Sequence, residues 1–444
     1  MPEFLDLLTE EIKTKRKDIE RITSNLSEIS AEYSLLVSEK WKNLPTPVEP
    51  KGKVFAVDSS NGIIELRGGG VLLIVRSLAL ASNSQMLRKL TVEALYPRNI
   101  RDFEEYIRLL REHLEHLVAH SALEEKPSFI MLDGSLYGRM THVLRELDLE
   151  EREDFIFEYV KVYSDFLTEA LKNKVMVLGV SKDSRSTVFK EEILKERVLQ
   201  LAQDSGIDSK EILELWKVIR RRPREVLEKV REKVRSGFYP AKMLEYFEQA
   251  RSHVPDSKII MQAGVGEGFS MPLLLTLSRV IAGQFEVALD EKAEGQVEKL
   301  SRVFERSFDR NWSVFEKKAH ELISRLRSYP PVAVYYTVLG PNDDPIRVDL
   351  VSYDISENFR LGENNSQDAS RFFRDLEATP SILLSLSLLR SLYAGDRSYN
   401  ILLLEADRRV KMSAGTVETY RKIVMKELQT LILHSRGERR VHYP

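Results

Sequence analysis

Two aspartates, each placed directly after an apolar run, are the side chains in this sequence best suited to chemistry. Asp58 follows the four apolar residues 54–57 (Val-Phe-Ala-Val) of the predicted strand 53–58, and Asp133 follows 129–132 (Phe-Ile-Met-Leu) of the predicted strand 128–133. A short apolar run bounded by turn residues is typical of a buried strand. One such aspartate is usually a turn former, but two on neighbouring strands would meet at one rim of a sheet. There they could hold Mg²⁺ or Mn²⁺ against a phosphate.

A third carboxylate is expected from the helix between the two strands, because a hard cation binds several oxygen ligands. Apolar spacing predicts this helix at about 101–123, and its candidate ligands are Glu104, Glu105, Glu112 and Glu115. Position along the helix favours Glu112 and Glu115. A helical wheel places Glu115 nearer the buried face and Glu112 more nearly opposite, so the sequence leaves both open.

The same helix carries a rival feature, three histidines at His113, His116 and His120. Imidazoles at this spacing could bind zinc, but one helix rarely closes a metal site, so ordinary packing is the favoured interpretation. Serine chemistry is disfavoured, because no Gly-x-Ser-x-Gly motif surrounds Ser59, Ser60 or Ser135.

The elements that must position these residues follow a recognisable order. The predicted elements are strands 53–58, 62–67 and 70–80, helix 101–123, strand 128–133, helix 150–172 and strand 174–180. An antiparallel meander followed by crossover helices is the order of the ribonuclease H-like fold. We therefore predict an α/β protein with a ribonuclease H-like mixed sheet flanked by helices, in which the first and fourth strands supply one aspartate each.

The 444 residues divide into four predicted parts. These are an N-terminal helix and Pro-rich linker (1–50), the first part of the core (51–186), a charged helical insertion (187–254) and a C-terminal α/β part that completes the core and ends in a basic tail (255–444). Within the insertion, the cluster Arg220, Arg221 and Arg222 is a candidate phosphate contact, although charge on helices usually marks a solvated face.

Composition excludes several classes of site. The chain has no cysteine, which excludes disulfides, thiolate catalysis and cysteine-bound zinc. Its formal net charge is -2, so any contact with nucleic acid must be local. No apolar stretch is long enough to cross a bilayer, and the N-terminus lacks a signal-peptide pattern, so we expect a cytoplasmic protein. Abundant charge without cysteine is also typical of heat-adapted proteins.

Several motifs together resemble the NurA nuclease family of archaea and some bacteria. They lie at 57–60 (Val-Asp-Ser-Ser), 132–136 (Leu-Asp-Gly-Ser-Leu), 179–186 (Gly-Val-Ser-Lys-Asp-Ser-Arg-Ser), 268–272 and 404–408. The resemblance covers about residues 50 to 410. It implies a ribonuclease H-like core, manganese-dependent cleavage of DNA (with Mg²⁺ as a further possibility), a homodimer and association with the HerA helicase.

The resemblance also assigns roles to single residues. It implies that Asp58 and Asp133 bind metal, with Glu112 or Glu115 beside them. Lys182 would contact a phosphate or stabilise charge on the leaving group. Asp407 stands where the family has a late metal ligand, often histidine, and so departs from the pattern.

The residues and the resemblance together predict a metal-dependent DNA nuclease, and the resemblance implies that it acts in the resection of double-strand breaks. By resemblance, its activity would be 5′–3′ exonucleolytic on single- and double-stranded DNA and endonucleolytic on single strands. The alternative is a non-catalytic DNA-binding or scaffold subunit that docks on a motor ATPase. The two strand-end aspartates favour the nuclease, because a scaffold has no need of both.

Overall fold

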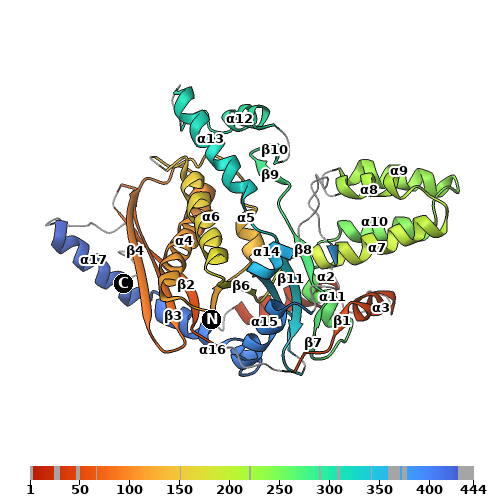
Figure 1. The fold of residues 1–444 in the computed structure, drawn as a ribbon, viewed down its shortest axis with the longest axis horizontal. Helices are drawn as coiled ribbons and strands as arrows, with labels where there is room; N and C mark the ends of the chain where they lie inside the picture. The colour runs from red at the N-terminus through yellow and green to blue at the C-terminus, as the bar shows by residue number, and fades with distance from the viewer. Residues whose placement is uncertain are drawn as a thin grey trace. The chain divides into compact units, whose positions relative to one another are not determined.

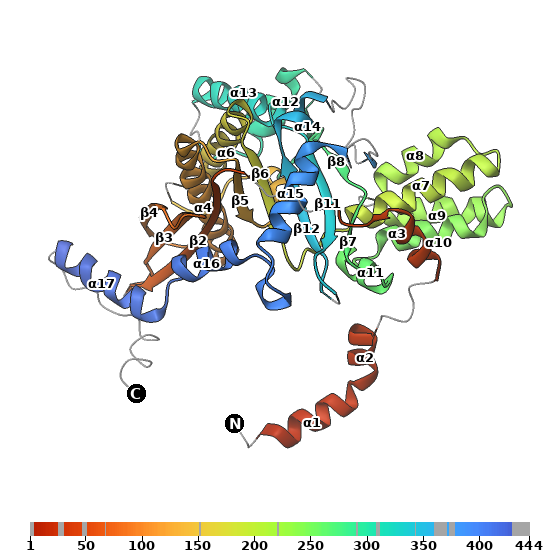
Figure 2. The same cartoon turned by 60° about the horizontal axis from the view of Figure 1, so that its bottom comes forward.

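The computed structural model describes residues 4–24, 31–46, 51–66, 68–150, 152–219, 222–289, 292–307, 311–341, 343–358, 371–372 and 378–428 (Figures 1 and 2). The chain forms two compact units. The larger comprises 45–182, 272–335 and 347–444, and the smaller comprises 1–44, 183–271 and 336–346. No helix among the described residues is both long enough and apolar enough to span a membrane.

The larger unit is built on a mixed sheet. Strands β2 (Val54–Glu65), β3 (Val71–Ala81) and β4 (Met86–Leu95) form an antiparallel meander. β5 (Phe129–Asp133) pairs in parallel with β2, and β6 (Met176–Ser181) pairs in parallel with β5. Beyond β6 lie β12 (Ile346–Val351), β11 (Val332–Val338), β8 (Leu273–Leu275) and β13 (Arg371–Phe372). β9 (Arg279–Ala282) and β10 (Phe285–Ala288) form a separate hairpin.

Helices cover both faces of this sheet, which confirms the predicted fold class. Figures 1 and 2 show α4 (Ile100–Ala122) and α6 (Phe155–Lys172) on one face, and α15 (Pro380–Ser391) and α16 (Ile401–Val410) on the other. The remaining helices of the unit are η2 (Leu123–Glu125), α5 (Leu136–Met140), α12 (Ala293–Ser301), α13 (Trp312–Arg327), α14 (Tyr353–Asn358), η4 (Asp396–Ser398) and α17 (Ala414–Leu428).

The main apolar core lies between the meander and helices α4 and α6. Tyr106, Leu110 and Leu114 of α4 are buried in one cluster with Leu73 and Val75 of β3. Their spacing at four-residue intervals gives α4 an apolar face. This burial fixes how α4 lies on the sheet, and therefore where its polar side chains can reach.

The smaller unit is mainly helical. Its helices are α1 (Leu5–Thr14), α2 (Arg16–Ser24), α3 (Ala31–Glu39), α7 (Val188–Asp204), α8 (Ser209–Val218), α9 (Pro223–Arg235), α10 (Ala241–Arg251) and α11 (Asp256–Gln262). β7 (Gly268–Ser270) pairs with β1 (Trp41–Lys42) and with the last residues of β11. The N-terminal helix expected from the sequence is interrupted at Lys15, between α1 and α2, and the apolar residues of α1 are exposed. Residues 25–30 of the expected helix lie outside the described residues.

Two details of the meander differ from the sequence prediction. Residues 53–58 and 62–67 were expected to be separate strands, yet β2 runs without a break to Glu65, so Asp58 lies within a strand. β3 pairs with every residue of β2 from Phe55 onward, and this ladder outweighs the low strand propensity of Asn61 and Gly62. β4 was not predicted, because it lacks an apolar run and is largely exposed.

Candidate active site

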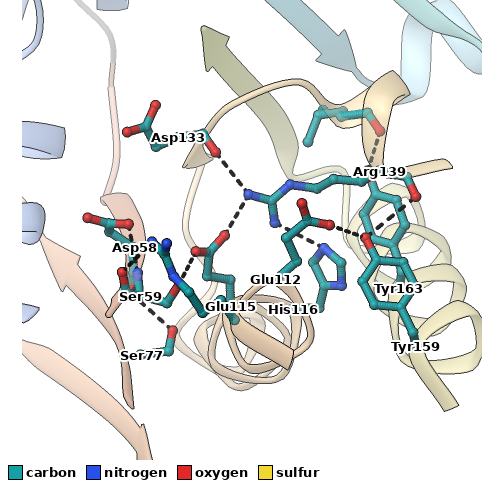
Figure 3. Close-up of polar contacts among 12 residues, drawn as sticks. Asp58, Ser59, Ser77, Glu112, Glu115, His116, Asp133, Arg139, Tyr159 and Tyr163 are labelled. Carbon is teal, nitrogen blue, oxygen red and sulfur yellow. Dashed lines mark hydrogen bonds and ion pairs between the residues drawn. The ribbon is translucent and has the colours of Figure 1, made fainter. Parts of the chain in front are cut away.

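The register of the sheet places the two predicted aspartates on neighbouring strands. The parallel ladder between β2 and β5 runs from Val54 and Phe129 to Val57 and Leu132. Asp58 and Asp133 therefore occupy the next position on each strand. Residues at matching positions of parallel strands point to the same side of the sheet, and Figure 3 shows both carboxylates on that side.

Asp58 is held in an environment that disfavours its charge. Its side chain is 6% exposed, and burial, together with the charges of Glu115 and Asp133, raises its pKa to about 7. The backbone N–H of Ser59 donates to Asp58 Oδ1 over 2.7 Å and partly offsets this effect. A nearby positive charge would therefore stabilise the ionised form of Asp58.

Asp133 shares this environment and has a basic neighbour. Burial raises its pKa, and the charge of Asp407 adds to the rise, whereas Lys182 and Arg139 oppose it. Lys182 comes directly after β6 and is exposed. The sheet thus brings a lysine to the same end of β5 as the aspartate, as expected from the sequence.

The two candidate glutamates of α4 have different partners. Glu115 is 5% exposed. It accepts hydrogen bonds from Ser59 Oγ and, over 2.5 Å, from Arg139 Nη2. Because side chains alternate along a strand, Ser59 and Asp58 point to opposite faces of the sheet. Glu115 therefore lies on the α4 face and raises the pKa of Asp58 through its charge.

Glu112 points away from β2. It accepts from His142 Nε2 over 2.7 Å and from the Tyr159 hydroxyl over 2.5 Å. Burial would raise its pKa, but these hydrogen bonds and the charge of Arg139 outweigh burial and hold the pKa at about 2. Of the two glutamates that the sequence left open, Glu115 is the one in contact with the strand that carries Asp58.

Tyr399 joins the aspartates on the α16 face, although sequence reasoning did not find it. It is 8% exposed, and its pKa is raised by burial and then by the charges of Asp133, Asp58 and Asp407. Lys182 Nζ lies 5.0 Å from the centre of its ring. A lone tyrosine in no motif carries no sequence signal. Asp407, on α16, is exposed and acts on this cluster through its charge.

Other predicted residues lie elsewhere. Arg220 and Arg221 fall outside the described residues, whereas Arg222 is exposed at the start of α9, 3.6 Å from Glu225. The three histidines have separate environments. His113 lies 3.5 Å from Glu158, His116 is buried beside Arg139, and His120 is exposed.

A cavity of about 490 Å³ opens beside Asp133 on the α4 face. Its lining includes Gly134 and Ser135 of the turn after β5, together with Glu112, Arg139 and His142. The lining is mainly polar and charged. The end of β5 is therefore accessible to a polar ligand.

The donor set fits a hard divalent cation. As the side chains stand, no three Asp, Glu or His residues in the described part of the chain converge on one point. However, Asp58 and Asp133 are oxygen donors on adjacent strands. Burial raises the pKa of each, and a neighbouring carboxylate adds to the rise, Glu115 and Asp133 at Asp58 and Asp407 at Asp133. A bound divalent charge would remove that penalty.

A solved structure shares this fold. The NurA nuclease from Sulfolobus solfataricus has a TM-score of 0.53 and 15% identity over 96% of this chain and 97% of its own. A second NurA structure has a TM-score of 0.40 and 16% identity, and the match covers 92% of this chain and 96% of that chain. A NurA bound to dAMP and manganese gives 0.36 at 16% identity, covering 98% of each. No curated protein matches the sequence.

The family comparison covers most of the chain. The model of the NurA domain matches residues 52–411, a span that contains Asp58, Glu115, Asp133, Lys182 and Asp407. The protein with this pair of aspartates on adjacent strands is therefore a member of the NurA family.

Proposed function

We propose that the protein is a divalent-metal-dependent deoxyribonuclease that hydrolyses DNA phosphodiester bonds. The observation that carries this proposal is the matched position of Asp58 and Asp133 on adjacent parallel strands, where Asp58 is buried, Asp133 is half-buried and both carboxyl groups have raised pKa values. Such a pair is unfavourable without a partner of opposite charge. Membership of the NurA family supports the same function.

Asp58 and Asp133 would hold the ion, and Asp407 is a further candidate on the same side of the sheet. Mn²⁺ is the proposed cofactor, with Mg²⁺ as an alternative, because both prefer carboxylate oxygens. When bound, such an ion lowers the pKa of water and neutralises charge on a phosphate. Glu115, held on the other face, adds negative charge near Asp58.

Lys182 would supply a positive charge for the phosphate at this site. Its ammonium lies near Asp133 and over the Tyr399 ring. From the end of β6 it would contact a non-bridging oxygen of the scissile phosphate and stabilise charge that develops there. Tyr399, which faces the same carboxylates, has a hydroxyl suited to orient the same phosphate by a hydrogen bond.

The finer features of the proposal come from the family resemblance. They are 5′–3′ exonuclease activity on single- and double-stranded DNA, endonuclease activity on single strands, a homodimer, and action with a HerA-type hexameric helicase in the resection of broken ends. A further proposal comes from the charge pattern of the sequence and not from the resemblance: Arg222, together with Arg220 and Arg221, would contact the phosphate backbone.

The test is cleavage of end-labelled single-stranded DNA by the purified full-length chain with Mn²⁺. We expect wild-type protein to degrade the strand, and Asp58→Asn and Asp133→Asn to lose activity by at least about 10³-fold. A chelator should abolish activity. Asp102→Asn is the matched control, because Asp102 is also buried but pairs with Arg145 over 2.7 Å, away from β2 and β5.

Two results would contradict the proposal. Undiminished cleavage by Asp58→Asn and Asp133→Asn would place the active site elsewhere. Absence of cleavage by the folded wild-type protein, with DNA binding retained, would favour the non-catalytic scaffold instead.

A further inference from the structure

The ladder that aligns Asp58 with Asp133 stops just before these residues. Its last pair among the described residues is Val57 with Leu132. Asp58 pairs onward only with Leu78 of β3, and Asp133 only with Val180 of β6. At the level of the two carboxylates, the backbone ladder between β2 and β5 therefore does not set their separation.

Side chains bridge the two strands at this level. Arg139 Nη2 donates to the backbone carbonyl of Asp133 over 2.9 Å and to Glu115 Oε2 over 2.5 Å. The other oxygen of Glu115 accepts from Ser59 Oγ, on the residue directly after Asp58. A continuous path of hydrogen bonds thus joins β5 to β2 through Arg139 and Glu115 (Figure 3).

Arg139 is itself fixed in place. It is 5% exposed, and its Nη1 lies 3.1 Å from Nε2 of His116, which must accept because a guanidinium only donates. The short helix α5 that carries Arg139 is held to α6, since the Tyr163 hydroxyl donates to the Leu136 carbonyl over 2.9 Å. The guanidinium therefore acts as a rigid connector.

We propose that Arg139 is a positioning residue for the metal site. With Glu115 it bridges β2 and β5 beyond the end of their ladder and sets the separation of the Asp58 and Asp133 carboxylates. It does not contact the ion. Its loss should therefore weaken binding of a divalent cation while every carboxylate remains. This inference rests on the proposed function, because it assumes that the two aspartates hold the ion.

The test measures the Kd of Mn²⁺ by titration calorimetry on full-length protein, with the urea unfolding midpoint measured in parallel. Arg139→Lys keeps the charge but cannot donate to three acceptors in a planar fork. We expect its Kd for Mn²⁺ to rise by about tenfold or more, as is typical when a supporting contact to a ligand is removed. Excess Mn²⁺ should restore part of the cleavage rate.

Two further variants sharpen the comparison. Ser59→Ala breaks the opposite end of the bridge without leaving a charge unpaired, so it decides the question if Arg139→Lys does not fold. We expect it to weaken Mn²⁺ binding as well. Arg145→Lys is the control. Arg145 pairs with Asp102 of α4, the helix that also carries Glu115, but among the described residues no hydrogen bond or ion pair joins it to Glu115, β2 or β5. Its Mn²⁺ affinity should equal that of the wild type.

The outcomes are distinguishable. A folded Arg139→Lys with a Kd within about twofold of wild type overturns the inference, even if its unfolding midpoint falls, because the role is then only structural. If Arg139→Lys does not fold, an unchanged Kd in Ser59→Ala overturns it. Failure of wild-type protein to bind Mn²⁺ removes the proposed function, and this inference with it.

Discussion

At the scale of single residues, the central feature is the carboxyl group of Asp58, whose ionisation the fold disfavours. The pKa of Asp58 is raised from 3.8 to about 7. The folded protein therefore binds this proton more tightly than the unfolded chain does. Stability from this group is present below about pH 4, falls as the pH rises to about 7, and stays low above it.

We predict that Asp58→Asn stabilises the metal-free protein at pH 8. The pKa difference, from 3.8 to about 7, corresponds to about 4 kcal/mol as an upper bound. The gain should disappear near pH 4. Urea unfolding in the presence of a chelator measures it. Asp102→Asn should instead lower stability, because the Asp102 carboxylate accepts from Arg145 and from the Asp148 N–H. A loss of stability in Asp58→Asn at pH 8 would contradict the account.

Lys182 gives the second prediction at this scale. Lys182→Met should lower the maximal rate of DNA cleavage by about 10- to 100-fold, because a charge that stabilises the phosphate is lost. Lys174→Met is a close control. Lys174 Nζ also lies 5.0 Å from a tyrosine ring, that of Tyr353. Single-turnover rates with saturating Mn²⁺ compare the two, and equal rates for both variants would remove Lys182 from the mechanism.

At the scale of elements, the turn after β5 is positioned by close packing over β6. A Cβ added at Gly179 of β6 would lie 2.5 Å from the Gly134 carbonyl and 2.8 Å from the Leu136 N–H group. Gly134 itself has φ of +99°, a conformation that favours glycine. The turn that follows Asp133 therefore depends on Gly134, which lies within it, and on Gly179 of β6, which packs against it.

We predict that Gly179→Ala displaces this turn and reduces both stability and cleavage. The backbone contacts cannot yield as a flexible side chain would, so the cost is about 1–3 kcal/mol, with cleavage reduced by about tenfold or more. Thermal unfolding and the DNA assay measure these effects. Gly295→Ala in α12, where nothing lies within 4 Å of the added Cβ, should be neutral or slightly stabilising. Equal behaviour of the two variants would refute the packing argument.

The elements that sequence reasoning predicted well are those with strong apolar patterns. The strand predicted at 128–133 is β5 at Phe129–Asp133, and the helix predicted at 101–123 is α4 at Ile100–Ala122. β4 was not predicted because the strand is largely exposed and its apolar residues do not form a continuous run. The position of Asp58 within β2, rather than at its end, depends on pairing with β3 and could not be derived locally.

The candidate site was predictable only where residues belong to motifs. Asp58, Asp133 and Lys182 each follow an apolar run, so their pattern is local. The choice between Glu112 and Glu115 needed the tertiary partners His142 and Ser59. Arg139 carries no sequence signal, because its contacts come from β5 and α4 rather than from its own neighbours along the chain.

At the scale of the whole molecule, a net charge of -2 means that DNA binding must come from local clusters. We predict that replacing Arg220, Arg221 and Arg222 by serine makes the salt dependence of DNA binding shallower. Each lost phosphate contact reduces the magnitude of the slope of log K against log salt concentration by roughly 0.7–0.9. Binding to single-stranded DNA across a salt series, in the Asp133→Asn background, measures it.

The control replaces Arg231, Lys233 and Lys242 by serine. These cations of the same unit pair with Glu248, Glu211 and Glu245, respectively, and in the described part of the chain none of these glutamates pairs with Arg222. Their loss should change the slope little. A slope that is unchanged by the arginine cluster, or changed equally by both triplets, would exclude the cluster as a specific DNA contact.

The most direct test of the central claim is the location of Mn²⁺ by anomalous diffraction from crystals of the wild-type protein. The account predicts an anomalous peak bound by carboxylate oxygens of both Asp58 and Asp133, at about 2.0–2.3 Å. A peak at other residues, with Asp58 and Asp133 free of metal in the same crystal, would contradict it.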